Sequence, residues 1–233
     1  YYFAVGAMLS TISLTAQESH ASTAKSAQVP CTIYVVRHGE TDWNTQDKIH
    51  GHSDVPINEL GERQAVQLKE ILDGIDFVAV YSSDLMRAHR TAEIVMQGRP
   101  LSITKTTALR ERFLGKWEGG SVVELRAALA RACVLAQSQE EFVNHTIDGV
   151  ESYAEAYVKV KKFITEVAAQ YQNKSVLFVA HGGLMRSILY HIAFMPGHTY
   201  KIANCSYIKL QVDNAGEISL VGCYGIKPTT DAY

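Results

Sequence analysis

The sequence contains few cysteines, and it carries no strong excess of charge of either sign. No two cysteines form a Cys-x-x-Cys pair; the four are Cys31, Cys133, Cys205 and Cys223. This spacing argues against a zinc site or a disulfide framework, so we expect small buried apolar residues instead. The 22 basic and 24 acidic residues give a net charge of −2. That balance offers no general attraction to nucleic acid or to anionic membranes, so an anion site must be built locally.

The chain also lacks internal repeats, low-complexity tracts and Pro/Gly-rich linkers after residue 30. Its 233 residues are 47% hydrophobic and 20% charged, which is typical of an ordinary globular protein. We therefore expect a single domain over residues 29–226 and a short tail at 227–233.

Residues 1–28 differ from the rest of the chain. Residues 1–16 are mostly apolar and carry no charge, and residues 17–28 are rich in Ser, Ala and Thr. An apolar core followed by small residues is similar to a signal peptide, although an initiator Met and a basic segment are missing. We expect either a truncated signal peptide or a disordered leader, which leaves a cytoplasmic and an exported location (periplasmic or secreted) both open. The segment is too short and too interrupted for stable membrane insertion.

Hydrophobic periodicity predicts alternating strands and helices. Strands are predicted at 32–36, 77–81, 102–106, 176–180, 207–212 and 218–224, and helices at 59–72, 85–96, 121–137, 151–170 and 184–194. Asn58 is the predicted N-cap of the first helix. The alternation indicates an α/β fold, a three-layer α/β/α sandwich with a largely parallel central sheet. Residues 119–149 are predicted to form an insertion over the mouth of the site.

Two predicted strands end in a histidine that glycine follows. One strand leads into Arg37 and His38, and the other leads into His181 and Gly182. Groups at the carboxyl ends of such strands open into the crevice where α/β folds bind ligands. An imidazole held beside a guanidinium suits an anionic, phosphorylated substrate, and the glycines allow a close approach of the backbone to that anion.

Three further charged residues follow predicted strands. Arg87 lies in the first turns of a predicted helix that begins just beyond the end of a strand. The N-terminus of that helix and the Arg87 side chain can both face an anion there. Arg90, one turn later, is predicted to lie on the surface. Glu111 enters a glycine-containing loop. It is either an acid at the edge of the site or the partner of a neighbouring arginine, Arg110 or Arg112.

Five ordered sequence blocks together resemble the histidine phosphatase superfamily, in its phosphoglycerate-mutase-like branch 1. They read RHGETDWN at 37–44, YSSDLxRAxxTA at 81–92, LxERxxGxWEG at 109–119, GxES at 149–152 and AHGG at 180–183. Each block alone is weak, but their order and spacing agree over residues 32–212.

The resemblance implies a role for each matching residue. His38 is implied to be the nucleophile that becomes phosphohistidine, and Glu111 is implied to protonate the leaving oxygen. The implied phosphate-binding residues are Arg37, Asn44, Arg87, His181 and Gly182. No metal and no cofactor are implied, and Asn204 resembles a position that supports the site from a late strand.

Chemistry adds expectations about protonation. His38 must be neutral at its attacking nitrogen, so its other ring nitrogen should donate to a backbone carbonyl. His181 is expected to act as a charged donor. Glu111 must hold a proton in the first step, which predicts that catalysis is favoured at acidic pH.

The insertion favours a phosphatase over a mutase. The resemblance implies that mutases carry a longer insertion with an adjacent arginine pair, whereas Arg126 and Arg131 here are five residues apart. Candidate substrate contacts are Lys116, Arg126 and His145.

Three alternatives stay open. They are a mutase, a phosphatase specialised for one metabolite such as a cobalamin precursor or a sugar phosphate, and a non-catalytic phosphate- or phosphoprotein-binding module. The presence of His38 and Glu111 argues against the last. The expected partner is a small phosphorylated metabolite, and a homodimer is a candidate assembly.

Overall fold

A six-stranded sheet forms the centre of the computed structural model, which describes residues 29–133, 138–147, 149–196 and 198–230, with the backbone alone for 130–133. The strands are β1 (Cys31–Arg37), β2 (Phe77–Ser83), β3 (Ile103–Thr106), β4 (Ser175–Ala180), β5 (Thr199–Val212) and β6 (Ile218–Thr229). Their order is β3-β2-β4-β1-β5-β6. The first four are mutually parallel, and β5 and β6 are antiparallel to their neighbours. The predicted, largely parallel sheet is therefore confirmed.

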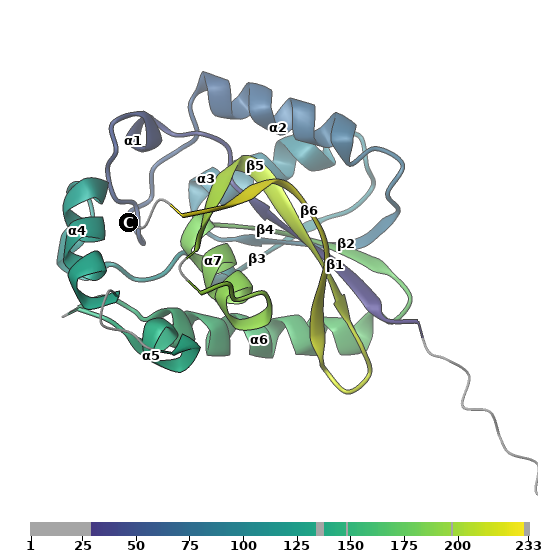
Figure 1. The fold of residues 1–233 in the computed structure, drawn as a ribbon. Helices are drawn as coiled ribbons and strands as arrows, with labels where there is room; N and C mark the ends of the chain where they lie inside the picture. Colours follow the sequence, from purple (N-terminus) through teal and green to yellow (C-terminus); the bar gives the residue numbers. More distant parts are fainter. Residues whose placement is uncertain (1–28, 134–137, 148, 197, 231–233) are drawn as a thin grey trace, which may run out of the picture.

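Helices cover both faces of this sheet (Figure 1). On one face, α2 (Glu59–Ile71) and α3 (Met86–Met96) contribute Leu68 and Ala92 to a core shared with Val179 of β4. On the other face, α6 (Tyr153–Gln170) and α7 (Gly182–Ile192) pack Ile164 and Ile188 against the sheet. The predicted three-layer α/β/α architecture is confirmed.

Local signals explain where these elements begin. Asn58 caps α2 as predicted, because its side chain accepts a hydrogen bond from the backbone N–H of Gly61 at 2.8 Å. Ser152 and Glu155 form a reciprocal capping box at the start of α6. Helix α7 begins at Gly182, two residues before the predicted start.

The insertion forms its own small core. Helix α4 (Val122–Cys133) contributes Leu125 and Leu129, which pack there against Ile49 and Val150. Helix α5 (Gln139–Asn144) instead places Val143 in the main core, beside α6 and α7. Figure 1 places α4 beside the short helix α1 (Asp42–Thr45), at one end of the sheet. The end of the predicted helix at 134–137 and the side chain of Arg131 lie outside the described residues. Neither α1 nor α5 was predicted, because each has fewer than two turns.

The edge strand differs most from prediction. β5 begins at Thr199, eight residues before the predicted start at 207. β6 ends at Thr229, beyond both the predicted strand end at 224 and the expected domain end at 226. Cys31 and Cys205 are buried as expected, but Cys223 is exposed because it lies on this edge strand. The side chain of Cys133 is outside the described part of the chain.

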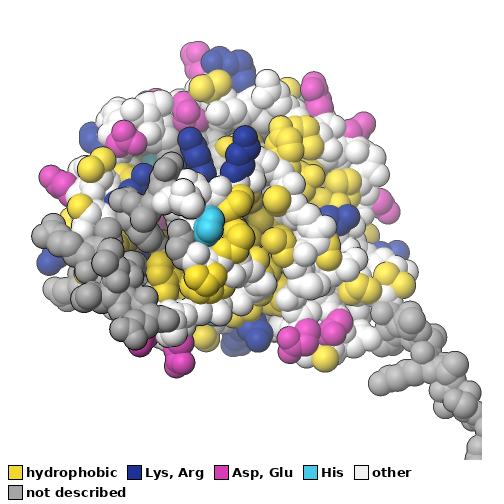
Figure 2. All heavy atoms as spheres, in the orientation of Figure 1, with side chains coloured by type: hydrophobic (Ala, Val, Ile, Leu, Met, Phe, Trp, Pro, Cys, Tyr) yellow, Lys and Arg dark blue, Asp and Glu magenta, His cyan; other side chains and the backbone are white. Residues whose placement is uncertain are grey.

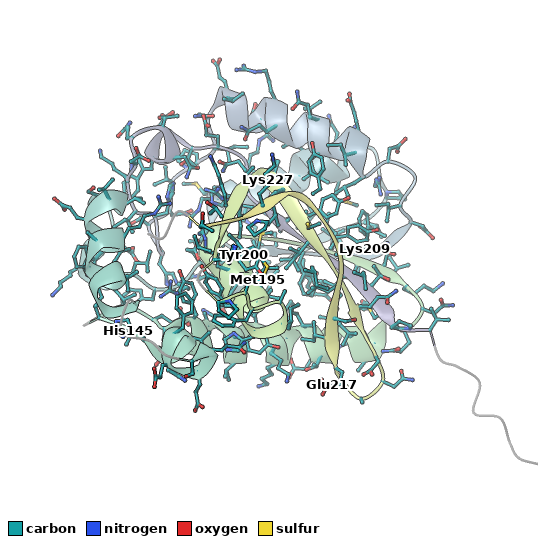
Figure 3. All side chains as sticks on the ribbon, viewed as in Figure 1. His145, Met195, Tyr200, Lys209, Glu217 and Lys227 are labelled. Atoms are coloured by element: carbon teal, nitrogen blue, oxygen red, sulfur yellow. The ribbon has the colours of Figure 1, made fainter. Side chains whose placement is uncertain are left out.

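An apolar pocket of about 370 Å³ lies between β6 and the C-terminal half of α7, and hydrophobic side chains gather there in Figure 2. Figure 3 labels Met195 and Tyr200, which line it. No residue of the histidine site described below lines this pocket.

The expected leader lies outside the described residues. Within 29–230, apart from the gaps given above, none of the helices combines the length and the hydropathy that a bilayer crossing requires.

Candidate active site

The sheet brings the two predicted histidines together. β1 and β4 are parallel neighbours, with Arg37 in register with Ala180, so both strands deliver their next residue to the same edge. The ring centroids of His38 and His181 lie 5.3 Å apart. The backbone N–H of His38 donates to the carbonyl of Ala180 at 3.1 Å, which links the two strand ends directly.

His38 is held as a neutral imidazole. Its Nδ1 lies 2.7 Å from the carbonyl oxygen of Gly39. Because a carbonyl only accepts, Nδ1 carries the proton, and Nε2 keeps its lone pair. Burial, together with the charges of Arg87 and Arg37, holds the pKa of His38 well below its usual value. The predicted contact with a backbone carbonyl is confirmed.

Arg87 is fully buried at the start of α3. Its guanidinium donates to the carbonyl oxygens of Ser53 and Gly51, each at 2.8 Å, and to Nδ1 of His181 at 3.2 Å. Burial lowers the pKa of Arg87 to about 10, so the group stays charged at neutral pH. Arg90, one turn later, is half exposed and pairs with Glu62, as the surface interpretation predicted.

The same contact decides the protonation of His181. Nδ1 accepts from Nε of Arg87, so the ring proton lies on Nε2. Burial and the neighbouring Arg87 hold the pKa of His181 well below its usual value. The expectation of a charged His181 is therefore wrong: the structure offers a neutral N–H donor. This Nε2 is buried and finds no hydrogen-bond acceptor among the described residues.

Arg37 offers a second donor. Its Nη1 donates to the carbonyl of Ile202 at 2.6 Å, which fixes the guanidinium, whereas its buried Nε has no acceptor within the described part of the chain. A Cβ on Gly182 would lie 3.3 Å from that Nε, so the glycine permits this close packing. The backbone N–H of Gly182, in the first turn of α7, also lacks an intrahelical acceptor.

The Glu111 carboxylate lies at the N-terminus of α7. Its oxygens accept from the backbone N–H groups of Gly183 at 2.8 Å and Leu184 at 2.9 Å. The interpretation of Glu111 as an ion-pair partner is wrong. Arg110 instead forms a bidentate pair with Asp84, and the Arg112 guanidinium donates to a backbone carbonyl. Glu111 thus lies next to the segment that carries His181.

Asn44 presents its amide nitrogen. Its Oδ1 accepts from the backbone N–H of Thr41 at 3.1 Å and from Nδ2 of Asn204 at 3.2 Å. Both donors hold the oxygen inward, which leaves the NH₂ group for an anion. Asn204 also donates to the carbonyl of His38 at 3.0 Å, so it supports the site from β5 as predicted.

A loop at 50–53 that sequence reasoning missed connects these groups. His52 Nε2 lies 2.9 Å from the carbonyl of Glu111, and the Glu118 carboxylate accepts from the backbone N–H groups of His52 and Ser53, both at 3.0 Å. Glu118 therefore clamps the loop whose carbonyls hold Arg87. The only signal in the sequence was the Trp117-Glu118-Gly119 block, whose partner is far away along the chain.

The three candidate substrate contacts belong to the insertion side of the molecule. Lys116 and Arg126 are exposed, and half-buried His145 follows α5 (Figure 3). Their contact with substrate stays a prediction. Among the described residues, no group of three or more His, Cys, Asp or Glu side chains is arranged to hold a metal ion.

Comparison with known proteins identifies the family of this site. A family model described as the histidine phosphatase superfamily (branch 1) matches residues 33–222. The chain belongs to that superfamily. The resemblance seen in the five sequence blocks is therefore confirmed.

Named relatives of this histidine phosphatase superfamily member include both phosphatases and mutases. The chain is 32% identical to the "uncharacterized phosphatase PhoE" of Bacillus subtilis over 69% of this chain and 77% of that protein. It is 31% identical to the "probable phosphoglycerate mutase GpmB" of Citrobacter koseri over 80% and 93%. A solved mycobacterial glucosyl-3-phosphoglycerate phosphatase matches with a TM-score of 0.69 and 25% identity, over 83% of this chain and 98% of that one.

Proposed function

We propose that this protein hydrolyses phosphomonoesters through a phosphohistidine at Nε2 of His38. One observation carries the proposal: buried N–H donors of Arg37 and His181 that lack acceptors among the described residues lie beside an imidazole with a free Nε2 lone pair. A phosphoryl group in contact with that lone pair satisfies both donors. Buried donors left unpaired cost free energy, so such a site favours an anionic ligand.

The proposed reaction has two steps. In the first, Nε2 of His38 forms a bond to phosphorus, the bond to the ester oxygen breaks, and Glu111 gives its proton to that oxygen. In the second, water attacks phosphorus, Glu111 takes a proton from the water, and the N–P bond breaks. The guanidiniums of Arg37 and Arg87 stabilise charge on the phosphoryl oxygens in both steps.

The proposed substrate is a small phosphorylated metabolite. Two relatives named as phosphatases support hydrolysis. The relative named as a probable phosphoglycerate mutase, matched over 93% of its length, keeps mutase activity as a second candidate. Arg126 on α4 is exposed and has no adjacent arginine, which supports the phosphatase.

The test compares wild type with His38→Ala on an aryl phosphate and a metabolite panel in the presence of a chelator. Phosphate release and isomerised product are both recorded, and Arg90→Ala is the matched control for loss of a nearby cation. Release that disappears only in His38→Ala supports the proposal. Isomerisation with little release identifies a mutase, and phosphate binding by a folded protein without turnover identifies a binding module.

A labelled substrate tests the intermediate itself. Because phosphohistidine survives alkali, we expect an alkaline quench to trap one label per chain in wild type and none in His38→Ala. Light scattering of the full chain tests the homodimer, and N-terminal sequencing of the expressed protein tests whether the leader is removed.

A further inference from the structure

A third histidine, His50, adjoins the site. Its ring centroid lies 5.9 Å from that of His38 and 5.6 Å from that of Trp43. It belongs to the segment between α1 and α2, and no role follows for it from the sequence. Its Nε2 contacts the hydroxyl of Thr41, which lies three residues before Asn44.

The contacts of His50 define its tautomer. Nε2 lies 2.6 Å from the hydroxyl oxygen of Thr41. The backbone of Lys48 acts to raise the pKa of His50, as a nearby carbonyl that accepts a ring proton does, and this favours a proton on the other ring nitrogen. Nε2 therefore accepts the Thr41 hydroxyl proton. Burial and the charges of Arg87 and Arg37 lower the pKa of His50 to about 3, so the ring stays neutral at physiological pH.

Thr41 is fully buried and is the N-cap of α1. Its Oγ1 accepts from the backbone N–H of Asn44 at 3.2 Å. The single hydroxyl proton has two acceptors nearby, Nε2 of His50 at 2.6 Å and Oδ1 of Asn44 at 3.3 Å, and the shorter contact takes it. Among the described residues, the Asn44 oxygen is then held by two N–H donors, the backbone of Thr41 and the side chain of Asn204. The placement of Thr41 therefore affects the amide, whose NH₂ group is left for a ligand.

We propose that His50 is a positioning residue that acts through Thr41 to orient the Asn44 amide toward the phosphoryl group. The inference rests on the proposed function in one respect, namely that phosphate binds next to His38. It is measured by phosphate binding rather than by turnover, so a protein that binds phosphate but hydrolyses nothing still tests it.

The test is calorimetric titration of the full chain with inorganic phosphate. We expect His50→Leu to weaken phosphate binding roughly tenfold, because the Thr41 side chain loses its shortest hydrogen bond. Thr41 supplies both a backbone N–H to the Asn44 amide and the cap for the Asn44 backbone, so its displacement moves the amide. His50→Gln keeps an acceptor for the Thr41 hydroxyl and should bind within about threefold of wild type. The double variant His50→Leu/Asn44→Ala should bind no more weakly than Asn44→Ala alone.

The matched control is His191→Leu. His191 is a half-buried histidine of α7 that stacks on Tyr157 and bonds to the Ser187 carbonyl, away from the site. It should lose thermal stability but bind phosphate as wild type does. The inference is overturned if His50→Leu binds phosphate normally, if His50→Gln is as weak as His50→Leu, or if the effects of His50→Leu and Asn44→Ala add. Thermal unfolding confirms that each variant is folded at the titration temperature.

Discussion

Single side chains in this site are held by hydrogen bonds that leave one chosen atom free. Nδ1 of His38 donates to a backbone carbonyl, which leaves the Nε2 lone pair free. Nδ1 of His181 accepts from Arg87, which leaves the proton on Nε2 available. The amide oxygen of Asn44 accepts two hydrogen bonds, which leaves its NH₂ group to donate to a ligand. In each of these three side chains, one polar atom is therefore hydrogen-bonded within the protein and fixes the orientation. The second polar atom determines what the site can bind.

Arg87→Lys should lose most activity although the charge is kept. The guanidinium reaches three acceptors at once, and an ammonium cannot reproduce that fork. We expect kcat/KM for an aryl phosphate to fall about 100-fold, and stability to fall by about 2 kcal/mol, because a buried acceptor is left unpaired. Steady-state kinetics and urea unfolding measure both. Arg90→Lys, on the exposed face of the same helix, should change neither.

Glu111→Gln should be sensitive to the leaving group. An amide keeps one acceptor oxygen at the α7 N-terminus, sets its NH₂ group against the second backbone N–H there, and gives no acidic proton to the departing oxygen. We expect kcat for phenyl phosphate to fall about 10²–10³-fold, and for p-nitrophenyl phosphate much less, because nitrophenolate leaves without protonation. Equal losses for the two esters would show that Glu111 is not the acid.

At the scale of elements, parallel strands and helix starts decide what meets at the site. β1 and β4 deliver the two histidines, α3 delivers Arg87, and the first turn of α7 binds the Glu111 carboxylate. Periodicity and strand ends were enough to predict these elements. The loop at 50–53 escaped prediction, because its shape depends on Glu118, which lies 65 residues beyond Ser53.

Gly183→Ala tests the contact between α7 and the acid. A Cβ there would lie 2.3 Å from Oε1 of Glu111, so the carboxyl group must move. We expect kcat to fall about tenfold or more because the acid is displaced, with a smaller change in thermal stability. Gly222→Ala on the edge strand is the control, since among the described residues its Cβ would approach Lys209 alone, at an ordinary van der Waals distance of 3.8 Å. Normal kcat in Gly183→Ala would show that the observed Glu111 position does not matter for catalysis.

At the scale of the whole molecule, the buried histidines make stability depend on pH. His38, His50 and His181 all have lowered pKa values, with that of His50 at about 3. Below the pKa of about 6.5 that histidine has in the unfolded chain, these side chains bind protons in the unfolded state but stay neutral in the folded state. Their contribution is fully present above about pH 6.5 and is lost as pH falls toward the folded pKa values.

We therefore expect the free energy of unfolding to fall by about 1 kcal/mol per pH unit for each of these histidines below pH 6. Urea unfolding at pH 7.5, 6.5, 5.5 and 4.5 measures the slope. His50→Gln removes one such group and should reduce the slope, whereas a slope unchanged in this variant would contradict the neutral state assigned to His50. Any acidic optimum of activity must be separated from this loss of stability.

The sequence by itself determined the fold class, the family and the main candidate residues. Apolar runs ending in Arg37-His38 and Ala180-His181 predicted parallel strands with polar groups at one edge, because strand burial and strand ends are local properties. The same local logic explains the N-cap at Asn58 and the surface position of Arg90.

Only the tertiary structure decided protonation states and partners. His181 is neutral because Arg87, 94 residues earlier, occupies its Nδ1, and Glu111 binds the start of α7 rather than a neighbouring arginine. His50 gained a role only through its distance to Thr41 and its burial beside two guanidiniums. Hydrogen bonding and desolvation depend on which groups the folded chain brings within a few ångströms, and sequence spacing does not contain that information.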